Sequence, residues 1–173
     1  MGSVVVTACA SAGTVRPPFS PLYEAMVDTL LVVPVLSPEL EQRILGEQLD
    51  ALDDAVIERA QLIAELEQRT IDEGLDIRVA NVQDGYLETR WFNVVSRRSD
   101  DGDVAHPERE ILLRFWVDPV GPLGYKLTAE AVYRRVSDPS LPSREREVMV
   151  PEDHEGEAIL TRILDGVREQ FGG

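Results

Sequence analysis

The segment 85–95, Gly-Tyr-Leu-Glu-Thr-Arg-Trp-Phe-Asn-Val-Val, constrains the fold more than any other part of the sequence. It is rich in aromatic and β-branched residues with partial alternation, which is typical of a β-strand. The residues 83–85, Gln-Asp-Gly, predict a turn before it, and 75–79 alternate as a preceding strand. We expect a three-residue loop with Gly85 in the left-handed conformation, because this register buries one coherent face. That face would hold Leu75, Ile77, Val79, Leu87, Thr89 and Trp91.

Two further strands are predicted by alternation in residues 111–117 and 125–133. Their inner faces would carry Ile111, Leu113, Phe115, Val117, Tyr125, Leu127, Ala129, Ala131 and Tyr133. Residues 147–150 are expected to form a short edge strand. The sequence therefore predicts an antiparallel sheet of four to five strands.

Three helices are expected around this sheet. A short one would run from Leu22 to about Leu31, and a long one over residues 38–73, with Ser37 as its N-cap and Gly74 as its C-terminal cap. Unbroken, the long helix would span ~54 Å, against a domain diameter of ~30 Å, so we expect a break or bend near Gly46. The last helix is expected over 153–171, with a regular apolar stripe.

These elements predict an α+β fold, a two-layer sandwich whose long N-terminal helix and C-terminal helix pack on one face of the antiparallel sheet. With 173 residues, of which 43% are hydrophobic, the chain is long enough for one domain with a substantial core. We assign residues 1–20 to a segment outside the fold and residues 21–173 to a single domain.

The charge and the motifs exclude several function classes. The net charge of −15 argues against a nucleic-acid partner, since phosphate binding depends on cationic side chains. No pattern typical of a catalytic, phosphate-binding or dinucleotide-binding site appears. Residues 152–155, Glu-Asp-His-Glu, look like an acidic helix start, and His154 has no second histidine or cysteine at ligand spacing. We therefore predict no catalytic residue, metal or cofactor.

The only cysteine, Cys9, lies in a distinctive context. Residues 6–9, Val-Thr-Ala-Cys, resemble a bacterial lipobox, and the Ser/Gly/Pro-containing residues 11–18 resemble a flexible tether. A signal peptide needs a basic region and an apolar core of about 7–15 residues, which the residues before Cys9 do not supply. Either the start is truncated or misassigned, or the match is due to chance. In the first case Cys9 is the lipidation site of a periplasm-facing outer-membrane lipoprotein.

The outer face of the sheet is the candidate partner-binding surface. Strand alternation directs Glu88, Arg90, Arg114, Trp116, Lys126, Glu130 and Arg134 outward, together with Tyr86, Phe92 and Leu112. Such a face is either a solvated set of ion pairs or a protein-binding surface, in which arginine and aromatic side chains serve as anchors. An exposed Trp116 would favour binding. The candidate binding residues are Arg90, Arg114, Trp116, Arg134, Glu88 and Glu130.

The lipobox-like residues, the tether, the 85–91 hairpin strand and the closing helix resemble the small lipoproteins of bacterial envelopes. The lipoprotein C subunit of the β-barrel assembly machinery is the nearest type, and the resemblance covers residues 50–171 by pattern. It implies a membrane-anchored, non-enzymatic domain that binds other envelope proteins. Two alternatives remain. One is a cytosolic acidic adaptor or secretion chaperone, in which Cys9 is incidental, and the other is a hydrolase using carboxylates in the sheet–helix cleft.

Overall fold

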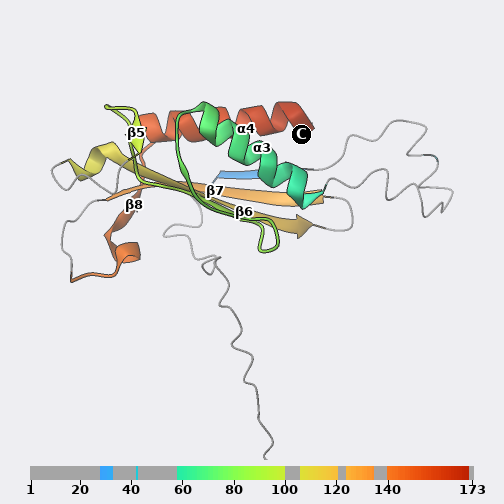
Figure 1. Cartoon of the computed structure of the whole chain (residues 1–173), viewed down its shortest axis with the longest axis horizontal. Coiled ribbons are helices and arrows are strands. Elements are labelled where there is room, and N and C mark those ends of the chain that lie inside the picture. Colours follow the sequence, from blue (N-terminus) through green and yellow to red (C-terminus); the bar gives the residue numbers. More distant parts are fainter. Residues whose placement is uncertain are drawn as a thin grey trace, which may run out of the picture.

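The computed structural model describes residues 28–32, 42, 58–99, 106–120, 124–134 and 140–171. Within them a mostly antiparallel sheet is covered on one face by two helices, α3 (Arg59–Asp72) and α4 (Glu155–Phe171), which form the upper layer in Figure 1. The α+β class and the packing of helices on the sheet are confirmed. The lipobox-like segment, its tether and the expected bend near Gly46 lie outside the described residues. The helix expected over residues 38–73 is corrected at its start, because Glu58 has extended backbone angles and α3 begins at Arg59.

The sheet has the strand order β1-β7-β6-β3-β2 along its main path. These strands are β1 (Asp28–Val32), β7 (Gly124–Arg134), β6 (Glu110–Val120), β3 (Tyr86–Thr89) and β2 (Ile77–Asn81). Three short strands branch from it. They are β4 (Phe92–Asn93), which pairs with β6, β5 (Arg98–Ser99), which pairs with β4, and β8 (Glu147–Met149), which pairs with β7. Two short 3-10 helices, η2 (Pro107–Arg109) and η3 (Ser143–Arg146), precede β6 and β8.

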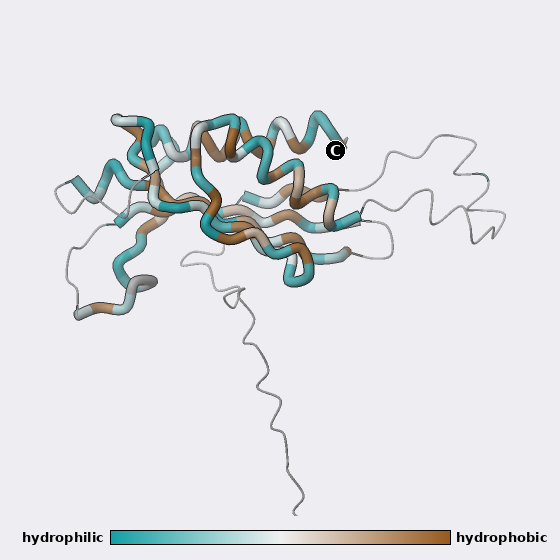
Figure 2. Tube along the Cα trace, viewed as in Figure 1, coloured by the Kyte–Doolittle hydropathy of each residue, from teal (hydrophilic) through white to brown (hydrophobic). Residues whose placement is uncertain are grey.

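The main core lies between the helices and the sheet. Alternate residues of β6 and β7, among them Leu113, Phe115 and Leu127, pack against the apolar stripes of both helices. The prediction for the inner faces of these two strands is therefore confirmed. In Figure 2 the brown, apolar segments gather where the helices face the sheet.

The N-terminal strand β1 corrects one prediction. Residues 28–31 were expected at the end of a helix, but 28–32 pair with 125–129 of β7. Leu30 and Val32 are buried in the core while Leu31 is half exposed. This alternation is the period of a strand whose one face is buried.

The helix α3 ends as the sequence predicts, in a cap with a positive-φ glycine. Gly74 has a φ of 89°, its N–H donates to the Ile71 carbonyl at 2.8 Å, and the Leu75 N–H donates to the Thr70 carbonyl at 3.1 Å. These two bonds form a Schellman motif, which satisfies carbonyls that the helix itself leaves unpaired.

The chain reversal between β2 and β3 differs from the expected loop. Gly85 is left-handed with a φ of 61°, as predicted, but the turn comprises residues 82–85 and the strand β2 contains an irregularity between Ile77 and Val79. Ile77 lies opposite Thr89, whereas Val79 lies opposite Glu88. Two residue steps along β2 therefore match one residue step along β3. This irregularity at Arg78 interrupts the continuous buried face that was expected for the two strands.

A second bulge corrects the placement of the aromatic pair Trp91 and Phe92. Glu88 on β3 lies opposite Arg114, and Phe92 on β4 lies opposite Ile111. Four residue steps from Glu88 to Phe92 therefore match three residue steps along β6. The extra residue inverts the side-chain alternation. Phe92 is therefore buried in the main core, and Trp91 packs on the other side of the sheet against Leu112, Val132 and Met149.

Alanine substitution of Gly85 tests the geometry of the turn between β2 and β3. A Cβ there would lie 2.3 Å from the Val117 carbonyl oxygen, whereas a Cβ on Gly74 would meet no atom within 4 Å. Both glycines have positive φ, so alanine at either position introduces backbone strain of ~1–2 kcal/mol. We expect Gly74→Ala to lower the free energy of unfolding by about that amount, and Gly85→Ala by a further ~1–3 kcal/mol for the clash. Urea unfolding of both variants measures the difference, and equal losses would contradict this geometry.

Candidate functional site

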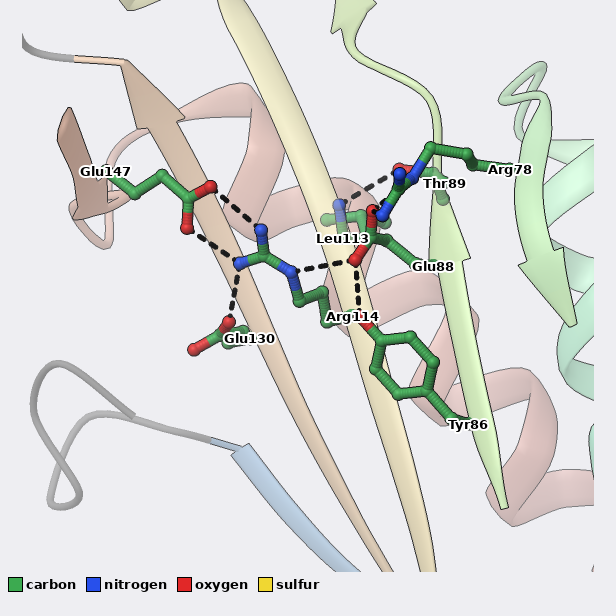
Figure 3. Close-up of polar contacts among 8 residues, drawn as sticks. All are labelled: Arg78, Tyr86, Glu88, Thr89, Leu113, Arg114, Glu130 and Glu147. Atoms are coloured by element: carbon green, nitrogen blue, oxygen red, sulfur yellow. Dashed lines mark hydrogen bonds and ion pairs between the residues drawn. The ribbon is translucent and has the colours of Figure 1, made fainter. Parts of the chain in front are cut away.

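The candidate site is a buried network of charged side chains on the sheet face opposite the helices. At its centre is Arg114 on β6, which lies in register between Glu88 on β3 and Glu130 on β7. A third carboxylate, Glu147, comes from β8 (Figure 3). The four side chains are between 0% and 8% exposed. Charges are rarely buried to this extent unless they are paired.

The guanidinium of Arg114 donates four hydrogen bonds to these carboxylates. Its Nε donates to Glu88 Oε2 at 3.1 Å and its Nη1 to Glu130 Oε1 at 2.9 Å. Glu147 receives two, from Nη1 and Nη2, both at 2.8 Å. The Glu147 contact is thus bidentate, the strongest geometry for an arginine–carboxylate pair. One planar cation therefore connects β6 with β3, β7 and β8.

Two further donors complete the surroundings of Glu88. The Tyr86 hydroxyl donates to Oε2, and Arg78, at the irregularity of β2, donates to Oε1. Burial raises the pKa of Tyr86 well above its ordinary value, and its hydrogen bond to the negative Glu88 raises it further. Tyr86 is therefore a hydrogen-bond donor at every physiological pH.

The electrostatics of Arg114 are set by two opposing effects. Burial acts to lower its pKa, because desolvation penalises the charged form. The hydrogen bonds and charge of Glu147, with the contributions of Glu88 and Glu130, outweigh burial and raise the pKa. Arg114 thus stays charged, and its chemical role in this arrangement is to join strands through charge-assisted bonds.

The burial of this network corrects the expectation that the outer face of the sheet is exposed, either as solvated ion pairs or as a protein-binding surface. Glu88, Arg114, Trp116 and Glu130 do lie on the face away from the main core, but they are 3%, 7%, 0% and 0% exposed. Trp116 is fully buried and packs beside Tyr86, with ring centroids 5.7 Å apart. Tyr86 and Leu112, also expected to be outward, are buried as well, and Phe92 is in the main core.

Of the predicted binding residues, Arg90 and Arg134 remain near solvent. Arg90 is exposed and Arg134 is half buried. The guanidinium of Arg134 lies over the ring of Trp91, 4.4 Å from its centroid. Sequence reasoning missed this pair because it placed Trp91 on the opposite face. We call the group Arg90, Trp91 and Arg134 the Trp91 corner.

A separate pair of acids joins the sheet to α4. Asp28, at the start of β1, and Glu157, in the first turn of α4, hydrogen-bond each other through their side chains. Burial raises the pKa of both carboxyl groups, and the negative charge of Asp28 further raises the pKa of Glu157. The hydrolase alternative requires a deep pocket lined by facing acids of raised pKa, and this pair supplies the acids alone.

Neither a known family model nor a curated protein matches this chain. Within the described residues, no group of three or more histidine, cysteine or acidic side chains is arranged to hold a metal ion. In the same part of the chain, no helix is both long and apolar enough to cross a bilayer.

The network predicts a specific pattern of mutational effects. Arg114→Met removes the cation from three buried carboxylates and should lower the free energy of unfolding by ~3–5 kcal/mol. The quadruple variant Arg114→Met/Glu88→Gln/Glu130→Gln/Glu147→Gln also removes the three negative charges. It should recover part of the lost stability, because no buried carboxylate is then left without its cation. Arg168→Met, which breaks an exposed ion pair with Asp165, serves as the control and should change stability by less than ~1 kcal/mol. A loss for Arg114→Met as small as the control's would contradict the buried network.

Proposed function

We propose that this protein is a non-enzymatic protein-interaction or assembly module of the bacterial envelope, anchored by a lipid on Cys9 in the outer membrane and facing the periplasm. Its partners are other envelope proteins. The Trp91 corner is its docking surface. The sequence signals at residues 6–9 and 11–18 support the anchor, and the geometry of the sheet supports the docking surface.

The observation that carries the docking surface is the stack of Arg134 on Trp91. Tryptophan and arginine are enriched among the residues that dominate binding energies, because they supply large rigid surfaces and planar charge. Trp91 is half buried on the cluster Leu112, Val132 and Met149, so its position is fixed before a partner arrives. A preorganised anchor loses little side-chain entropy on binding.

The charge distribution also favours this corner. The chain as a whole carries a net charge of −15, whereas Arg134 places a cation over Trp91 and the exposed Arg90 precedes Trp91 in the chain. Arg114 cannot serve the same purpose, since carboxylates surround it and it is 7% exposed. A partner with an acidic or neutral surface fits the Trp91 corner better than the rest of this acidic protein.

The alternatives differ in what they require. A cytosolic adaptor or secretion chaperone could use the same corner but would not depend on Cys9. A hydrolase would depend on carboxylates, and the Asp28–Glu157 pair is the observation that favours it. Separate variants therefore distinguish the anchor from the docking surface.

The test uses the natural full-length gene in the organism that carries it. We expect the wild-type protein in the membrane fraction and Cys9→Ala in the soluble fraction, because acyl chains supply ~0.8 kcal/mol per buried CH₂. We expect Arg90→Ala/Arg134→Ala to remain in the membrane but to recover cross-linked partners at least ~10-fold less than wild type, since loss of one anchor typically weakens an interface by ~2 kcal/mol.

The control is Arg168→Ala, an exposed arginine on α4 in the helix layer. It should leave both location and partner recovery unchanged. A Cys9→Ala protein that stays in the membrane fraction would overturn the anchor. Equal recovery of the same partners by wild type and by Arg90→Ala/Arg134→Ala would overturn the docking surface.

A further inference from the structure

The helix α4 begins at an unusual capping residue, His154. Its backbone carbonyl accepts the N–H groups of Glu157 at 3.0 Å and Ala158 at 3.3 Å. Its side-chain Nδ1 accepts the N–H of Gly156 at 2.9 Å. An N-cap side chain normally supplies this acceptor as an oxygen of Ser, Thr, Asp or Asn, none of which takes up a proton near neutral pH.

The other ring nitrogen fixes the protonation state of His154. Nε2 lies 2.9 Å from the backbone carbonyl oxygen of Glu108 in η2. A carbonyl oxygen only accepts hydrogen bonds, so Nε2 must carry a proton. Because Nδ1 accepts from Gly156, it must carry none. The two contacts together require the neutral Nε2–H tautomer.

His154 also connects α4 to the sheet. Its ring stacks on Tyr133 of β7, with centroids 5.9 Å apart and an interplanar angle of 9°. Gly156 is packed closely beside it, since a Cβ there would lie 2.9 Å from Ile111 Cγ2 and 3.0 Å from His154 Nδ1. The first turn of α4 therefore lies against β6, β7 and η2. The His154 ring makes the contacts to β7 and η2.

We propose that His154 is a pH-dependent helix cap that releases the first turn of α4 when the ring gains a proton. Protonation at Nδ1 removes the lone pair that accepts the Gly156 N–H and sets two N–H groups against each other. It also places a positive charge at the positive end of the helix dipole. Imidazole side chains gain a proton between about pH 5 and 8, so the cap is lost on mild acidification.

Several charged residues lie near His154 in the sequence or on the 3-10 helix that its ring contacts. Glu155 and Glu157 belong to α4, Glu152 and Asp153 precede it, and Glu108 and Arg109 belong to η2. Beyond them, Arg97 Nη1 lies 3.8 Å from Glu155 Oε1, and His106 Nδ1 lies 3.4 Å from Glu108 Oε1. These charges do not preserve the cap, because the cap needs the unprotonated Nδ1.

The Asp28–Glu157 pair has the opposite pH dependence. Its raised pKa values mean that the folded state binds these protons more tightly than the unfolded chain does. Stability from this pair therefore increases as pH falls through the raised pKa values toward the ordinary carboxyl range near ~4. Global stability mixes the two effects, so the test needs a local signal at Gly156.

The experiment measures hydrogen exchange of the Gly156 amide by NMR on the whole chain, at pH 7.5 and pH 5.5, with correction for the intrinsic exchange rate. In the wild type we expect protection of this amide to fall about fivefold at pH 5.5, the equivalent of one hydrogen bond. In His154→Asn the side-chain oxygen caps the helix at both pH values, so protection should not change.

The matched control is His106→Asn, because the chain has two histidines and His106 is the other one. It should retain the wild-type loss of protection. Equal protection of the wild-type Gly156 amide at both pH values would overturn the proposal, and so would a loss that persists in His154→Asn. The wild-type measurement decides the matter even if the variant folds poorly.

Discussion

The buried ion network around Arg114 constrains the rest of the structure. A guanidinium on a covered sheet face is tolerated only where carboxylates surround it, because an unpaired buried charge is very unfavourable. Glu88, Glu130 and Glu147 supply this environment from β3, β7 and β8. The register of β6 must therefore place Arg114 between Glu88 and Glu130. A slip of one residue would turn its charge toward the apolar core beneath the helices.

The same face divides into a filled centre and an accessible corner. In the centre, Tyr86, Trp116 and the ion network are buried and bind one another. At the corner, the bulge after Thr89 turns Trp91 out of the main core and places it beneath Arg134. The bulge thus links fold to proposed function, since without the extra residue Trp91 would point toward the helices and Phe92 would take the outer face in its place.

Much of the fold could be predicted from local patterns, whereas the site could not. The inner faces of β6 and β7 follow from strict alternation, and Gly74 and the apolar stripe of α4 follow from helix periodicity and capping. The bulge at Arg90 and Trp91 has no such signal, because two adjacent aromatic residues suit either face equally well. The charges of Glu88, Arg114 and Glu130 predicted an exposed face. Their alternating sign across three paired strands was the available clue that they neutralise one another.

The most direct test of this division is the accessibility of the two tryptophans, which are the only ones in the chain. Trp91→Phe leaves Trp116 as the single emitter, and Trp116→Phe leaves Trp91. Acrylamide quenching of tryptophan fluorescence then reports on each position separately. The structure predicts weak quenching and blue-shifted emission for Trp116, and clearly stronger quenching for Trp91. Equal quenching of the two, or stronger quenching of Trp116, would contradict both the buried centre and the accessible corner.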